Sequence, residues 1–130
     1  MLFNFQQIMS IQKIFTKVKS KFSDRIELLS QAKSVEFEIL DKDERNFEET
    51  DALVIFHEDH NLDASGEETR DIFEKKLRPI HKIDINGTKQ VIVSHYGLWL
   101  ERNSVKEPLF IGTDQLIDNP KIEGLLDKMM

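Results

Sequence analysis

Five consecutive apolar residues at positions 52–56 constrain the fold of this chain more than any other segment. An apolar run of this length between polar residues is typical of a buried β-strand. The polar stretch 41–51 precedes it, and His57-Glu58-Asp59-His60 follows it. We therefore expect this strand to be the best-buried strand of the protein.

Apolar residues at helical spacing predict an N-terminal helix over residues 5–33, interrupted near Ser23-Asp24. Lys13, Lys17 and Lys21 recur every four residues and are expected on one solvated face of this helix. Four further elements are predicted: a half-buried strand at 35–39, a helix at 67–77 capped by Asp63 or Ser65, a short strand at 108–111, and a final helix opened by Pro120.

Asn86-Gly87 is the strongest turn signal in the chain, because both residues tolerate the positive φ of a type I′ hairpin turn. Strands at 81–85 and 88–95 would flank it. We therefore predict a single α+β domain over residues 1–130, with an N-terminal helix, a central helix, a C-terminal helix and a mostly antiparallel sheet of about four or five strands. The alternative is a small α/β sheet, because the strand, loop and helix at 52–78 also allow a parallel crossover.

Composition narrows the class of protein. The absence of cysteine excludes disulfide frameworks and thiolate metal sites. No apolar run approaches the roughly 20 residues that span a membrane, so we expect a cytoplasmic protein without membrane contact. Residues 1–8 are expected to be a disordered or non-native start, since Met9 offers a second initiator.

The net charge of −6 is unevenly distributed along the chain. Residues 1–34 carry six basic and two acidic side chains, whereas residues 35–79 carry fifteen acidic and six basic ones. This balance argues against a nucleic-acid partner. It favours a protein partner with a basic surface, bound by an inhibitor, immunity or chaperone-like domain without a cofactor. The residues expected to contact that partner are Glu36, Glu38, Asp43, Glu44, Glu48, Glu49 and Asp51.

Trp99 lies in an apolar patch with Tyr96, Leu98 and Leu100. Packing in the core is the default role for such a residue. An exposed Trp99 would instead anchor the partner, because tryptophan is enriched among the residues that dominate interface energetics.

The alternative to a binding domain is a metal-dependent hydrolase or nuclease. His57, Asp59 and His60 follow the buried strand, and ligands of open α/β sheets collect at the carboxyl ends of strands. Imidazole and carboxylate together suit a divalent metal, although the spacing matches no established metal motif. A variant of this hypothesis uses carboxylates alone, with Asp59, Asp63 and the helix start Ser65-Gly66-Glu67 holding Mg²⁺ and a phosphate.

Overall fold

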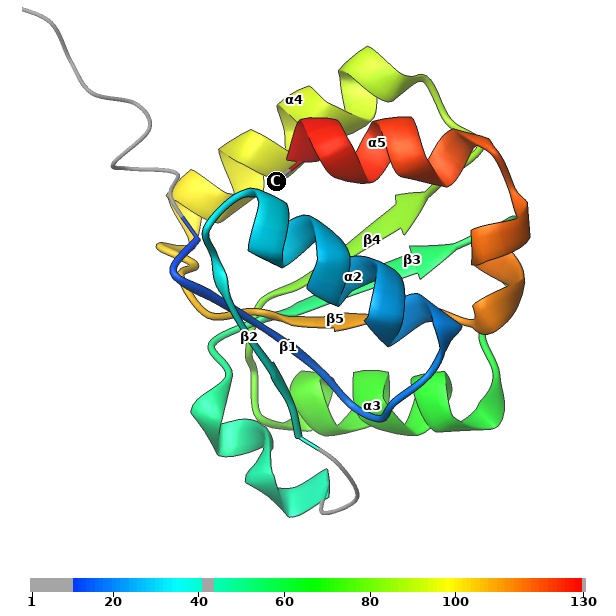
Figure 1. Cartoon of the computed structure of the whole chain (residues 1–130). Helices are drawn as coiled ribbons and strands as arrows, with labels where there is room; N and C mark the ends of the chain where they lie inside the picture. The colour runs from blue at the N-terminus through cyan, green and yellow to red at the C-terminus, as the bar shows by residue number, and fades with distance from the viewer. Residues whose placement is uncertain (1–10, 41–43, 130) are drawn as a thin grey trace, which may run out of the picture.

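A computed structural model describes residues 11–40 and 44–129. Its sheet has helices on both faces (Figure 1). In chain order the elements are β1 (Lys13–Thr16), α2 (Lys21–Ala32), β2 (Glu36–Ile39), the 3₁₀ helix η1 (Glu44–Glu49), β3 (Leu53–His57), α3 (Ala64–Lys75), β4 (Ile80–Asp84), α4 (Lys89–Arg102), β5 (Leu109–Ile111), the 3₁₀ helix η2 (Asp114–Asp118) and α5 (Lys121–Met129).

The five strands lie in the order β2-β1-β5-β3-β4, and every pair is parallel. The prediction of a mostly antiparallel α+β domain was therefore wrong, and the fold is a Rossmann-like α/β fold of the kind considered as the alternative. Parallel strands need crossover connections: α2 joins β1 to its neighbour β2, α3 joins β3 to its neighbour β4, and α4 leads from β4 back to β5 in the middle of the sheet. β5 lies between β1 and β3 in the middle of the sheet.

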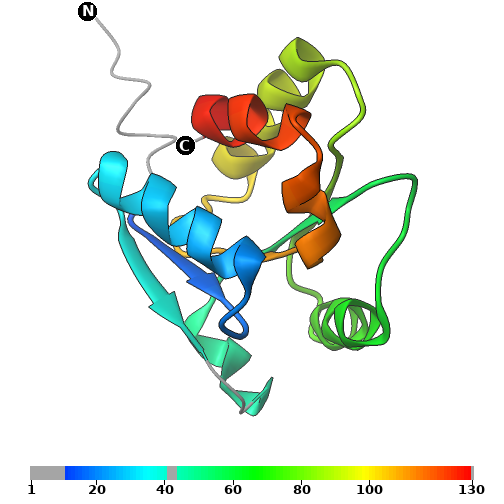
Figure 2. The same cartoon turned by 45° about the vertical axis from the view of Figure 1, so that its right-hand side comes forward.

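The helices form two layers, one on each face of the sheet (Figures 1 and 2). One core cluster joins α2, α4 and α5 to one face, and it includes Ile14 of β1 and Phe56 of β3. The other joins α3 and η1 to the opposite face, and it includes Phe15 and Ile55. Neighbouring residues of a strand point to opposite faces, so β3 is buried along its whole length between the two layers. This confirms the prediction drawn from the apolar run.

The predicted hairpin at Asn86-Gly87 is wrong. The turn exists, with Asp84 accepting hydrogen bonds from the backbone N–H groups of Asn86 and Gly87, but α4 follows it. Residues 91–93 suit a strand by composition. The helix forms because Tyr96 and Leu100, four residues apart, are buried together against the sheet. Tertiary packing thus overrides the local β preference.

The predicted N-terminal helix is also wrong in its first half. Within the described part of this segment, β1 comes first, and Ile14 and Phe15 are buried on opposite faces of the sheet. α2 begins after Ser20, whose side chain accepts a hydrogen bond from the backbone N–H of Ser23, while the Ser23 side chain accepts one from that of Ser20. This reciprocal cap fixes the start of the helix.

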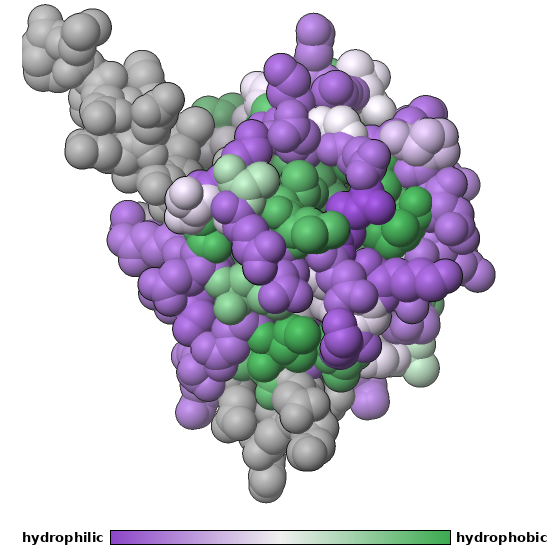
Figure 3. Space-filling model, viewed as in Figure 1, coloured by the Kyte–Doolittle hydropathy of each residue, from purple (hydrophilic) through white to green (hydrophobic). Residues whose placement is uncertain are grey.

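The remaining expected elements are confirmed within a few residues: β2, β4, β5, α3 with Asp63 as its cap, and α5 after Pro120. The expected disordered start at residues 1–8 lies outside the described residues. Within those residues, the chain has no helix with the length and apolar character needed to cross a membrane. The surface that carries α2 and α5 is mostly hydrophilic, with hydrophobic patches between the charged side chains (Figure 3).

Candidate ligand-binding site

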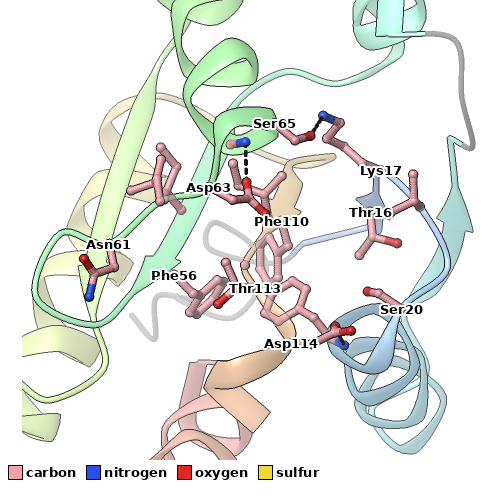
Figure 4. A pocket seen from close by; sticks show the side chains of 17 residues that line it. Thr16, Lys17, Ser20, Phe56, Asn61, Asp63, Ser65, Phe110, Thr113 and Asp114 are labelled. Carbon is pink, nitrogen blue, oxygen red and sulfur yellow. Dashed lines mark hydrogen bonds between the residues drawn. The ribbon is translucent and has the colours of Figure 1, made fainter.

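A cavity of about 250 Å³ opens at the carboxyl ends of β1, β5 and β3 (Figure 4). Three segments wall it: the β1–α2 loop from Thr16 to Ser20, the β3–α3 loop with the first turn of α3, and the chain that leaves β5. α2 and α3 pack on opposite faces of the sheet, so the loops after β1 and β3 diverge and leave space above β5. Such a switch point is where open α/β sheets bind ligands.

Three aromatic side chains form the floor of the cavity. Phe22, Phe56 and Phe110 line it and are almost completely buried. The ring centroids of Phe22 and Phe56 are 5.7 Å apart, and those of Phe56 and Phe110 are 5.2 Å apart. The rings pack on one another, so the cavity has a firm apolar base.

Gly112 allows the chain to leave β5 beside this floor. A Cβ atom at this position would lie 2.7 Å from Cε1 of Phe22 and 2.8 Å from Cδ1 of Leu116. Both distances are shorter than a carbon–carbon contact permits. A side chain here would force the ring or η2 to move, so glycine keeps the cavity wall close to α2.

Lys17 is the one cationic side chain among the described residues that line the cavity. It is only 9% exposed, and its Nζ donates a hydrogen bond of 2.6 Å to Oγ of Ser65 at the start of α3. Ser65 accepts this bond, so its own hydroxyl proton can still be donated. The ammonium group is thereby positioned on the α3 side of the cavity (Figure 4).

Thr16 lies on the α2 side of β1, because it alternates with Phe15, which faces α3. Thr16 is 2% exposed, and its hydroxyl has no hydrogen-bond partner among the described residues. Buried polar atoms are satisfied in most proteins, and those that are not call for an explanation. A ligand in the cavity would supply the partner.

Two carboxylates of the cavity cap helices. Oδ1 of Asp63 accepts a hydrogen bond of 2.7 Å from the backbone N–H of Gly66, at the start of α3 (Figure 4). Oδ1 of Asp114 accepts one of 3.1 Å from the backbone N–H of Phe22, at the start of α2. No hydrogen bond within the described residues reaches Oδ2 of either carboxylate. Both side chains are exposed, so this second oxygen of each is open to solvent and to a ligand.

The predicted metal residues are not part of this cavity. His57 ends β3 and is buried, and its Nδ1 accepts a hydrogen bond from the backbone N–H of His60. Burial lowers the pKa of the His57 imidazole. Asp59 and His60 are exposed and adopt positive φ. The described residues contain no group of three side chains that could hold a metal ion, so the structure adds no support to the metal hypothesis.

The carboxylate variant of that hypothesis included three residues that line the cavity. Asp63, Ser65 and Gly66 line the cavity, whereas Asp59 does not. Thr16, Lys17 and Asp114 also line the cavity and were not among the residues predicted for a site. Thr16 and Lys17 were not predicted because their segment was assigned to an N-terminal helix, whereas it forms the end of β1 and the loop that follows.

The acidic residues expected to contact a partner have varied positions. Glu38 forms an ion pair of 2.7 Å with Lys13 on β1, and this hydrogen bond raises the pKa of Lys13. Oδ2 of Asp51 accepts hydrogen bonds from the backbone N–H groups of Lys106 and Glu107. Glu36, Glu48 and Glu49 are exposed, Glu44 begins η1, and Asp43 lies outside the described residues.

Trp99 lies on α4 and is half-buried. Its ring stacks on His81 of β4 at a centroid distance of 5.0 Å, and it packs against the core cluster under α2, α4 and α5. Burial lowers the pKa of His81. These contacts give Trp99 a structural role in joining α4 to the edge strand.

No known protein family and no curated protein matches this sequence. Among solved structures, the fold resembles that of a protein from Syntrophus aciditrophicus SB with the provisional name of molybdenum carrier protein. The TM-score is 0.67, the likeness covers 92% of each chain, and the sequences are 14% identical. At this identity the likeness shows the fold alone. The parallel fold and this comparison leave the expectation of an α+β protein-binding inhibitor without support.

Proposed function

We propose that this protein binds a small phosphorylated ligand in the cavity at the carboxyl ends of β1, β5 and β3. The observation that carries the proposal is the buried ammonium group of Lys17, held beside the hydroxyl of Ser65 in a cavity at the switch point of the sheet. A lysine ammonium binds phosphate as a point charge, and nearby hydroxyl donors add hydrogen bonds to the phosphate oxygens.

Another hydroxyl group adds a hydrogen-bond donor to the cavity at the start of α2. Ser20 lines the same cavity, and its Oγ accepts a bond from the N–H of Ser23, so its hydroxyl proton can also be donated. We expect the protein to meet its ligand in the cytoplasm, the location that the sequence predicts.

The proposal predicts that replacement of Lys17 weakens phosphate binding. Isothermal titration calorimetry with inorganic phosphate and with n-propyl phosphate should show that Lys17→Gln weakens binding about tenfold or more, because a hydrogen bond to a charged group contributes about 1.5–3 kcal/mol. Molybdate belongs among the probes as well, since it is an oxyanion and the solved structure of similar fold bears the name of a molybdenum carrier.

Lys21→Gln is the matched control. Lys21 is exposed in the first turn of α2 and does not line the cavity. It should change the affinity by less than about twofold, because exposed charges contribute little. Equal weakening by the two variants, or no binding of any of these anions, would contradict the proposal. Binding of a basic protein by the acidic middle segment stays a prediction and is separate from this function.

A further inference from the structure

The two sides of the cavity differ in chemistry. On the α3 side lie the ammonium group of Lys17, the hydroxyl of Ser65 that accepts its hydrogen bond, and the exposed carboxylate of Asp63. On the α2 side lie Asp114 and Thr16, beneath the start of that helix. In Figure 4, Lys17 and Asp114 occupy opposite ends of the cavity. Each side carries one carboxylate, but among the described lining residues only Lys17 is cationic, so we place the phosphate on the α3 side.

The group that fits the Asp114 end has to donate a hydrogen bond. Oδ1 of Asp114 already accepts the backbone N–H of Phe22, whereas Oδ2 accepts no hydrogen bond within the described residues. An ionised carboxylate only accepts hydrogen bonds, and so does a fully ionised phosphate. These two groups cannot satisfy one another.

Thr16 provides the second, independent observation. Thr16 lines the cavity on the same side of the sheet as the start of α2, and its buried hydroxyl has no partner among the described residues. A threonine hydroxyl both donates and accepts. A ligand hydroxyl between Thr16 and Asp114 would accept from the former and donate to the latter, which satisfies both.

We propose that the ligand is a polyol phosphate, of the class that includes sugar phosphates, with its phosphate at Lys17 and a hydroxyl group read by Asp114 and Thr16. This inference rests on the proposed function and names the ligand class of the same cavity. The aromatic floor of Phe22, Phe56 and Phe110 would support the carbon chain between the two ends.

Two ligands of equal carbon number test the inference. Glycerol 3-phosphate carries two hydroxyl groups, and n-propyl phosphate carries none. Calorimetry on the full chain should show glycerol 3-phosphate binding about tenfold more tightly, because a hydroxyl bonded to a carboxylate makes a charge-assisted hydrogen bond. Thr16→Val, which removes the hydroxyl and keeps the shape, should reduce this preference.

The Asp114→Asn variant tests whether the carboxylate binds a ligand hydroxyl or only repels the phosphate. Asparagine keeps an oxygen for the N–H of Phe22, so the cap of α2 survives, but the charge is lost. We expect the preference for glycerol 3-phosphate to fall from about tenfold to about twofold, with n-propyl phosphate bound as well as before or better. Asp118→Asn is the control, because Asp118 ends η2 and does not line the cavity.

Two failures are distinguishable. If n-propyl phosphate and glycerol 3-phosphate bind equally well to the wild-type protein, the hydroxyl inference is overturned and the phosphate proposal stands. It is also overturned if Asp114→Asn tightens both ligands equally, because the carboxylate then only repels anions. If neither ligand nor inorganic phosphate binds, both proposals fall.

Discussion

At the scale of single residues, Gly112 has a steric role that can be measured. Gly112→Ala places a methyl group against Phe22 and Leu116, at 2.7 and 2.8 Å. Overpacking of this kind costs about 1–3 kcal/mol, so the variant should unfold at a lower urea concentration. An unchanged midpoint would show that the wall of the cavity is looser than the structure indicates.

Gly124→Ala is the matched substitution. Gly124 is exposed on α5, and the nearest atom to an added Cβ is Nζ of Lys89 at 3.3 Å, the end of a flexible side chain. Alanine in a helix is favoured over glycine by about 0.5–1 kcal/mol. The same chemical change should therefore stabilise the protein here and destabilise it at Gly112.

The site residues themselves were only partly predictable from sequence. Asp63 and Ser65 stood at a recognisable helix start, directly after a polar loop. Lys17 and Thr16 could not be found, because their importance depends on where β1 lies in the sheet. Asp114 reaches the site through a hydrogen bond to Phe22, 92 residues away, and no local pattern encodes such a contact.

At the scale of elements, Asp51 anchors the approach to β5. Its Oδ2 accepts the backbone N–H groups of Lys106 and Glu107 at 2.7 and 3.0 Å. Asp51→Ala should lower the free energy of unfolding by about 2 kcal/mol, since hydrogen bonds to a charged group are lost, whereas Asp51→Asn keeps an acceptor and should cost less. Urea unfolding measures both.

Glu49→Ala is the control for that comparison, because Glu49 is exposed on η1. It should change the stability by no more than about 0.5 kcal/mol. If Asp51→Ala, Asp51→Asn and Glu49→Ala were equally stable, Asp51 would have no structural role. That result would favour the prediction that Asp51 contacts a partner.

Elements whose apolar residues recur at regular spacing could be predicted from sequence. Elements whose structure depends on their place in the sheet could not. β3, β2 and α3 have clear patterns. β1 has four residues and is buried on both faces. Its apolar residues therefore show no strand alternation, and in the sequence they continue the pattern of the helix that follows. α4 contains a strand-like run, and its turn resembles a hairpin turn. The parallel topology depends on contacts between distant segments, which local patterns do not specify.

At the scale of the whole molecule, stability should depend on pH through two histidines, of which His57 is buried and His81 is partly buried. His57 lies at the end of β3, and His81 stacks under α4. Burial lowers the pKa of both from the ordinary value of 6.5. The unfolded chain therefore binds protons before the folded protein does, so stability is greatest above pH 6.5 and is lost as the pH falls toward the folded pKa values.

Urea unfolding at about pH 7.5 and about pH 5.5 measures this loss. His57→Asn keeps a side-chain acceptor for the N–H of His60 and removes one titrating group, so its stability should fall less between the two pH values. The stability of His81→Asn should also fall less between the two pH values. A loss as large as that of the wild type in both variants would mean that other groups cause the pH dependence.

The position of β5 has a consequence for synthesis on the ribosome. This three-residue strand joins β1 to β3, and its Leu109 pairs with Phe15 near the other end of the chain. Until residues 109–111 have been made, the pairs β1–β2 and β3–β4 have no strand to connect them. The nascent chain therefore carries two open sheet edges, one of them on the apolar β3, until β5 has been made. Folding is completed late, and a chaperone that shields these edges would act on residues made long before.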